Sequence, residues 1–182
     1  TNAEVVLFSN KSGVATAAAA GPCFEGANIS CGMSATKGAV YAFGLDYGQT
    51  SYKTISDEKP VGICGTGLID VVAELLKNEI IDESGYMDED YDVSSGVFLA
   101  CADVRQYQLA KSAVCSAILS LMKTEGVTFD DISHMYISGG FSSKINIGNA
   151  VNSGLLPHEL AGKTVALNNS SLQGTVKYAL EQ

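Results

Sequence analysis

The order of the predicted elements favours an α/β fold in which helices flank a mixed sheet. The last third of the chain has the pattern strand, helix, strand, helix over 135–138, 147–153, 164–167 and 172–180. Two pairs of strands and two helices precede it. Alternation of this kind is typical of layered α/β domains. We therefore predict an α/β domain, and 182 residues with 46% hydrophobic content are enough for its core.

The first predicted element is a hairpin of strands 4–8 and 14–20. Turn-forming residues occupy 9–13 between the two arms. The second arm, Val14-Ala-Thr-Ala-Ala-Ala-Ala20, consists of small side chains, which indicates close packing against another backbone or a ligand. The segment 21–38 that follows is rich in glycine and small polar residues, so we expect an ordered loop there.

A second strand pair and two helices are predicted in the middle of the chain. The strands cover 39–45 and 50–55. The first helix follows the glycine cluster 64–67 and covers 68–78, and its polar face is expected to contact water. The longer helix covers 103–122. Its predicted buried stripe comprises Tyr107, Ala110, Val114, Ile118 and Leu121.

Charge and composition exclude several classes of function. The net charge is -9 and the pI is near 4.5, so nucleic acid is not an expected partner. No apolar stretch reaches the roughly 18 residues that would span a bilayer. The N-terminus also lacks a basic start followed by an apolar run. We therefore expect no membrane partner and a cytoplasmic location.

The sequence shows no pattern of metal ligands. Its five cysteines form no Cys-x-x-Cys pair, which favours reduced and mostly buried thiols over zinc, an iron–sulfur cluster or disulfides. The acidic run 88–92 alternates like a calcium loop but lacks the required glycine and glutamate, so it is expected to be a solvated loop. His134 and His158 have no nearby dyad partner and are expected to be structural.

The leading candidate for a binding site is the glycine turn in Tyr136-Ile-Ser-Gly-Gly-Phe-Ser-Ser143. Glycine has no Cβ, so such a turn can expose N–H groups to a phosphate or let a sugar approach the backbone. That geometry suits a nucleotide. A plain tight turn is the alternative explanation. The candidate residues are Ser138, Gly139, Gly140, Phe141 and Ser142.

A second glycine cluster lies directly before the first predicted helix. Its residues Gly65, Thr66 and Gly67 offer free N–H groups and the positive end of the helix dipole to an anion. The cluster lacks the Gly-Lys-Ser/Thr ending of a Walker loop. Ordinary steric demands at the start of a helix explain these glycines as well.

Two carboxylates occupy positions typical of site residues. Glu25, in the loop Gly21-Pro-Cys-Phe-Glu-Gly26, is placed to hold a magnesium-bound water or a ribose hydroxyl. A solvated or capping carboxylate is the alternative. Glu4, preceded by Thr1 and Asn2, raises the same possibility.

One lysine of the long predicted helix is a further candidate. Lys111, followed by Ser112, lies about one position off the apolar stripe. Its side chain can therefore line a cleft and stack beside an adenine or reach the phosphates. An ordinary surface lysine is the alternative.

Four stretches resemble, in this order, the C-terminal part of the reductive activators of corrinoid proteins. Together they make the chain look like the second half of an actin-like ATPase domain, of the acetate and sugar kinase, heat-shock protein and actin superfamily. The implied fold is the ribonuclease H-like half of such a domain, with a mixed sheet. The stretches are Thr1–Glu4, Gly21–Met33, Asp103–Lys111 and Gly139–Ala150, the last leading to Gly154-Leu-Leu-Pro157.

The resemblance implies an ATP-dependent protein that restores corrinoid methyl carriers after their cobalt has reached the inactive Co(II) state. A corrinoid protein of a methyltransferase system is the expected partner, ATP with magnesium the expected ligand, and a homodimer is possible. The chain starts without Met, so we expect a fragment whose [2Fe-2S] domain and first ATPase half lie upstream. The implied roles are the second phosphate loop for Thr1, Asn2 and Glu4, the adenosine motif for Gly139 and Gly140, and the flanks of the adenine for Lys111 and Ser112.

The sequence departs from the family pattern at three positions. Ala3 and Ser138 replace residues that are usually glycine and alanine, and Ser34 stands where an arginine is common. The change at Ser34 argues against an anion contact from that loop. A small-molecule kinase of the same superfamily and a non-catalytic actin-like scaffold remain alternative functions. No sugar- or acid-binding aspartate was identified to support the kinase.

Overall fold

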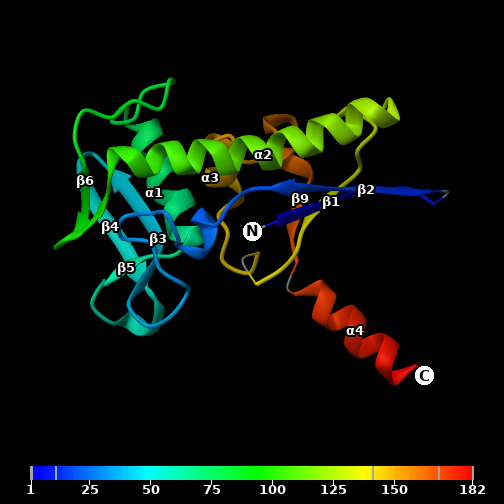
Figure 1. Ribbon diagram of the computed structural model, residues 1–182, viewed down its shortest axis with the longest axis horizontal. Coiled ribbons are helices and arrows are strands. Elements are labelled where there is room, and N and C mark those ends of the chain that lie inside the picture. The colour runs from blue at the N-terminus through cyan, green and yellow to red at the C-terminus, as the bar shows by residue number, and fades with distance from the viewer. Residues whose placement is uncertain (1, 11, 141, 168, 182) are drawn as a thin grey trace.

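The computed structural model describes residues 2–10, 12–140, 142–167 and 169–181 (Figure 1). The strands are β1 (Asn2–Phe8), β2 (Gly13–Ala19), β3 (Ala39–Asp46), β4 (Gln49–Thr54), β5 (Gly62–Ile63), β6 (Tyr91–Ser94), β7 (Val97–Leu99), β8 (Met135–Ile137) and β9 (Thr164–Ala166). The α-helices are α1 (Gly65–Lys77), α2 (Cys101–Glu125), α3 (Ile147–Asn152) and α4 (Ser170–Leu180). Short 3-10 helices are η1 (Cys23–Glu25), η2 (Ile55–Asp57) and η3 (His158–Lys163).

The strands form small sheets beside the helices, and both predicted strand pairs are confirmed. β1 and β2 pair antiparallel in unbroken register from Asn2 opposite Ala19 to Phe8 opposite Gly13. β3 lies between antiparallel β4 and parallel β5. β8 and β9 pair in parallel, as an α/β connection through α3 allows. The predicted α/β class is therefore correct.

Helix α1 is buried on nearly every side except at its last turn, so the expectation that its polar face contacts water is wrong for Thr66 and Asp70 and holds for Lys77. β3 packs on one side of it, and α3 and η1 pack on others. Its Asp70 is 5% exposed and accepts hydrogen bonds from Asn149 Nδ2 at 2.7 Å and from the Phe43 amide at 3.3 Å. Burial raises the pKa of Asp70, although the bond from Asn149 opposes that shift. Because its carboxylate is satisfied, the polar residue can remain in the core.

Helix α2 is the longest element and runs along the β1–β2 hairpin (Figure 1). Of the predicted stripe, Tyr107, Ala110 and Leu121 are buried, while Val114 and Ile118 are half-buried. Tyr107 and Ser153 share a buried hydroxyl–hydroxyl hydrogen bond of 2.5 Å. This bond ties α2 to the end of α3.

The segment 88–92 was expected to be a solvated loop, and that expectation is wrong for its second half. Tyr91 and Asp92 begin β6, which pairs with β7 in a short antiparallel hairpin. The hairpin is anchored by three buried apolar side chains. These buried residues are Val93, Val97 and Leu99.

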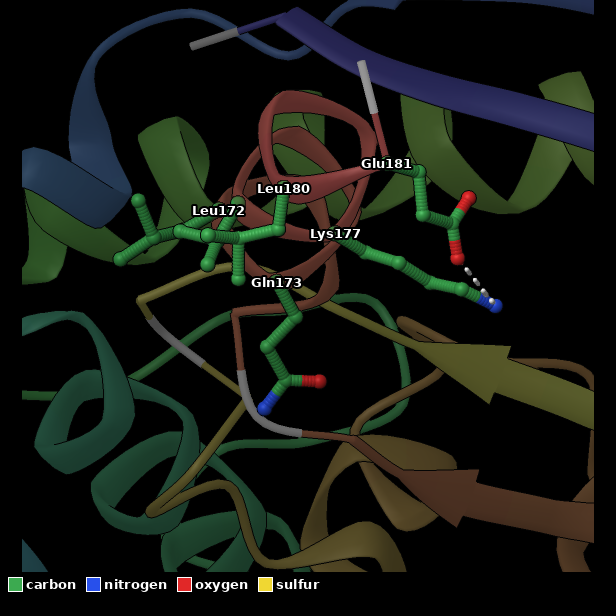
Figure 2. A pocket seen from close by; sticks show the side chains of 6 residues that line it. Leu172, Gln173, Lys177, Leu180 and Glu181 are labelled. Atoms are coloured by element: carbon green, nitrogen blue, oxygen red, sulfur yellow. Dashed lines mark ion pairs between the residues drawn. The ribbon is translucent and has the colours of Figure 1, made fainter.

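Helix α4 extends away from the rest of the structure (Figure 1). A pocket of about 560 Å³ runs along it, lined by residues of this helix and by its C-cap Glu181 (Figure 2). Leu172 and Leu180 are 60% and 82% exposed there, and Lys177 pairs with Glu181 at 3.8 Å. A hollow along one helix does not hold a ligand from several directions, so it is not the candidate site. Across the described residues, no helix combines the length and apolarity needed to cross a membrane.

Candidate functional site

A cleft of about 1450 Å³ lies between β1, α2, β8 and the start of α1. It brings together predicted residues from four distant segments of the chain. Those that line it are Asn2, Glu4, Glu25, Gly65, Thr66, Ser138, Gly139 and Gly140. Gly21, Gly26, Gly67, Lys111, Ser112 and Ser142 are not part of its described lining. Thr1 and Phe141 lie outside the described residues.

The glycine turn at the end of β8 faces open space. Gly139 has a φ of 123°, a conformation that favours glycine, and a Cβ at Gly139 or Gly140 would meet no atom within 4 Å. Packing therefore does not demand glycine at 140. The space beside the turn is available to a ligand.

Neighbouring serines hold the turn in place. Ser142 is buried, and its hydroxyl contacts the carbonyl oxygens of Gly139, at 2.8 Å, and of Leu167. Ser138 Oγ accepts a hydrogen bond from the Ser170 amide at 3.1 Å, at the start of α4. Ser142 thus links the turn to the segment after β9, and its hydroxyl is used within the protein.

The second glycine cluster lies inside the first turn of α1, which begins at Gly65 after the N-cap Cys64. The sequence had placed it before the helix. Gly65 and Thr66 line the cleft, and Thr66 Oγ1 donates to the Tyr41 carbonyl at 3.0 Å. A Cβ on Gly67 would lie 2.1 Å from the Val40 carbonyl oxygen. The steric explanation therefore holds for Gly67, whose absent side chain lets α1 approach β3.

Glu25 ends the 3-10 helix η1 and lines the cleft. The loop around it is tightly folded, because a Cβ on Gly26 would lie 2.3 Å from the Met33 amide. Buried Asp103, at the start of α2, accepts hydrogen bonds from the amide and the hydroxyl of Ser30 at 2.9 and 3.1 Å. Backbone packing and Asp103 thus hold this carboxylate loop against α2.

Lys111 points to a different place from the one expected. Its Nζ lies 2.9 Å from where a Cβ of Gly154 would be, just after α3. A lysine at a helix C-terminus interacts favourably with the helix dipole. The Lys111 side chain therefore covers the C-terminal end of α3. The cation that lines the cleft is a different lysine.

That cation is Lys144, which the sequence reasoning missed. It lines the cleft, and its Nζ lies 5.5 Å from the centre of the Tyr41 ring, within the range of a cation–π contact. Lys144 is the one lysine or arginine in the described lining. Its position four residues after Gly140 was the available signal.

The chemistry of the cleft fits a magnesium ion that arrives with phosphates. Within the described part of the chain, no three His, Cys, Asp or Glu residues are grouped to bind a metal by themselves. Glu4, Glu25 and Asp57 line the cleft singly. Magnesium is usually held by one or two carboxylates together with substrate phosphates, and the lining supplies such carboxylates.

Comparison with known proteins identifies the family. A family model described as the C-terminal domain of RACo, the ASKHA domain, matches residues 1–182. The chain belongs to this family. The solved structure of a reductive activator for corrinoid, iron-sulfur protein superposes on it with a TM-score of 0.88 at 32% identity. That match covers 98% of this chain and 32% of the other.

Two curated relatives of the ASKHA domain share 27% identity with it. One is the corrinoid activation enzyme RamQ of Eubacterium limosum, matched over 211 residues, all of this chain and 36% of that protein. The other is the Co(II) methylated amine-specific corrinoid protein reductase of Methanosarcina barkeri, matched over 205 residues, all of this chain and 38% of that protein. The chain spans about a third of the length of these relatives.

Membership of the ASKHA family confirms the resemblance seen in the sequence. The departure at Ser34 now has a structural setting, since Ser34 lines the same cleft as Lys144. The family's arginine is absent at position 34, but Lys144, from a different part of the chain, brings a positive charge to the same cleft.

Proposed function

We propose that this chain is the nucleotide-binding half of an ATP-dependent activator that supports reduction of inactive Co(II) corrinoid methyl-carrier proteins. One observation carries the proposal: the Gly139–Gly140 turn, where an added Cβ would meet no atom within 4 Å, lines a cleft that also contains Glu25, Thr66 and Lys144. The names of the relatives, all concerned with corrinoid activation, support this function over a small-molecule kinase or a scaffold.

Each end of the nucleotide has a suitable group in the cleft. The glycine turn lets the ribose and adenine lie against backbone. Lys144 and the N-terminus of α1, at Gly65 and Thr66, attract the phosphates. Glu25, with Glu4 as the second carboxylate, holds the water shell of the magnesium ion that neutralises those phosphates.

The role of ATP in the proposed activity is energetic coupling. A Co(II) corrinoid accepts an electron at a very low potential, so reduction must be linked to a favourable step. ATP supplies that step by favouring one conformation of two lobes that close around it. We propose that the [2Fe-2S] domain and the other lobe belong to a longer polypeptide, of which residues 1–182 form the C-terminal ATPase subdomain.

The test is ATP-dependent reduction of a Co(II) corrinoid protein by the full-length protein, followed by ultraviolet–visible absorption. Gly140→Val should abolish the ATP dependence, because its side chain projects into the open space that the nucleotide needs. Gly162→Val is the matched control, since a Cβ at Gly162 also meets nothing within 4 Å and Gly162 is outside the cleft lining. Equal ATP-dependent activity in both variants would refute the proposal.

A further inference from the structure

One buried carboxylate lies close to the cleft without forming part of its described lining. Asp70 is 5% exposed and lies on helix α1, four residues after Thr66, which does line the cleft. A buried carboxylate is costly unless its oxygens accept hydrogen bonds. The two bonds that Asp70 accepts therefore show which elements it holds in place.

The two oxygens of Asp70 bind donors from two different elements. Oδ2 accepts the amide of Phe43, in strand β3, at 3.3 Å. Oδ1 accepts Nδ2 of Asn149, in helix α3, at 2.7 Å. Asn149 is itself 8% exposed, so this bond lies in a region of low dielectric, where hydrogen bonds are strong. Three elements, α1, β3 and α3, therefore meet at one carboxylate.

The same elements lead to the cation–π contact in the cleft. Tyr41 lies in β3, two residues before the amide that Asp70 binds. Lys144 lies five residues before Asn149, and Asn146 between them caps α3 by accepting the Asn149 amide at 3.2 Å. Lys144 Nζ is 5.5 Å from the centre of the Tyr41 ring. The contacts thus form a closed circuit that begins and ends at Asp70.

The position of Lys144 depends on this circuit because its own segment has no regular structure. Lys144 is exposed and lies between β8 and α3, in neither element. Its side chain is flexible, so an ammonium group that is already held beside a ring binds phosphates with a smaller loss of conformational entropy. The cleft therefore has a preorganised positive charge as long as β3 and the start of α3 stay in place.

We propose that Asp70 is a positioning residue for phosphate binding, and that its bonds to β3 and α3 hold the Tyr41 ring and the Lys144 ammonium together at the cleft. This inference rests on the proposed function, because it requires that the cleft binds the phosphates of a nucleotide. Asp70 carries the same sign of charge as a phosphate. Its contribution is therefore made through Lys144 and not by direct attraction.

Calorimetry of ADP and of adenosine with the full-length protein tests the role of Asp70. Asp70→Asn keeps the shape of the side chain, but its single acceptor oxygen can serve only one of the two donors. We expect ADP affinity to fall about three- to tenfold and adenosine affinity to stay unchanged. Asn149→Ala breaks the same link from the side of α3 and should have the same effect, so either variant alone is sufficient if the other does not fold.

Two comparisons separate positioning from a general loss of stability. Tyr107→Phe removes the buried 2.5 Å bond to Ser153 at the other end of α3. It should lower the melting temperature but leave ADP affinity unchanged. In a Lys144→Gln background, Asp70→Asn should cause no further loss of ADP affinity, because its effect is exerted through that lysine.

The outcomes distinguish failure of this inference from failure of the proposed function. The positioning role is refuted, and the nucleotide site is retained, if Lys144→Gln weakens ADP but Asp70→Asn and Asn149→Ala do not. It is also refuted if the losses from Asp70→Asn and Lys144→Gln add, or if Tyr107→Phe weakens ADP equally. Absence of ADP binding by the unmodified protein would instead refute the proposed function, and the inference with it.

Discussion

Replacement of Lys144 by glutamine is the most direct test of how the cleft binds phosphates. Lys144 is the one cation in the described lining, and the Tyr41 ring lies 5.5 Å from its ammonium group. Among the described residues it forms no ion pair with a carboxylate. Its charge is therefore available to an anionic ligand.

The expected effect follows from the exposure of Lys144. Two unit charges 4 Å apart attract by about 1 kcal/mol in water, and a diphosphate brings more than one charge near the exposed ammonium. We expect Lys144→Gln to weaken ADP binding about tenfold, which corresponds to about 1.4 kcal/mol. Adenosine, which lacks phosphates, should bind with unchanged affinity. The difference between the two ligands should shrink as salt screens the charge.

Calorimetry on the full-length protein measures both affinities. Lys144→Arg should retain most of the ADP affinity, since arginine also binds phosphate. Lys123→Gln is the matched control, because it removes the same charge from an exposed position outside the cleft lining. If Lys144→Gln weakens adenosine as much as ADP, or if Lys123→Gln has an equal effect on ADP, Lys144 does not act on the phosphates.

Four further outcomes are expected. Asn149→Ala removes the 2.7 Å bond to buried Asp70 and should cost about 1.5–3 kcal/mol of unfolding free energy at pH 7; exposed Asn152→Ala should cost little. Burial raises the folded pKa of Asp70, and the bond from Asn149 opposes that shift because it favours the ionised carboxylate. The cost of Asn149→Ala measured by urea unfolding should therefore shrink as falling pH protonates Asp70 in the folded state. Gly67→Ala forces α1 away from β3 and should destabilise the protein by about 1–3 kcal/mol, whereas Gly162→Ala should not. Residues 1–182 alone should bind ATP weakly or undetectably, because an actin-like site needs both lobes. A micromolar dissociation constant measured by calorimetry would contradict this.

Local sequence patterns were sufficient to predict the helices and strands that pack against elements close to them in the sequence. The β1–β2 hairpin was predictable from its turn residues, and α2 from the spacing of its apolar side chains. The polar face of α1 was misjudged because α3, which supplies Asn149 to Asp70, comes from a distant part of the chain. The β6–β7 hairpin was missed because the acidic residues around it hid three buried apolar positions, Val93, Val97 and Leu99.

The backbone positions of the candidate site could be predicted from the sequence. The directions of its long side chains could not be predicted as well. Glycines mark turns directly in the sequence, and Gly139, Gly140 and Gly65 do line the cleft. The direction of a lysine depends on its tertiary neighbours. Lys111 lies over Gly154, while Lys144 lies against Tyr41 from another element. Neither contact could be read from helical periodicity.

The contacts of the glycine turn bear on why residues 1–182 alone should bind ATP weakly. Ser142 fixes the glycine turn to the segment after β9, and Ser138 connects it to the start of α4. These bonds are made between described residues of the chain itself and do not depend on a ligand. Weak ATP binding by residues 1–182 would therefore be due to the second lobe, which an actin-like site needs in order to close around the nucleotide.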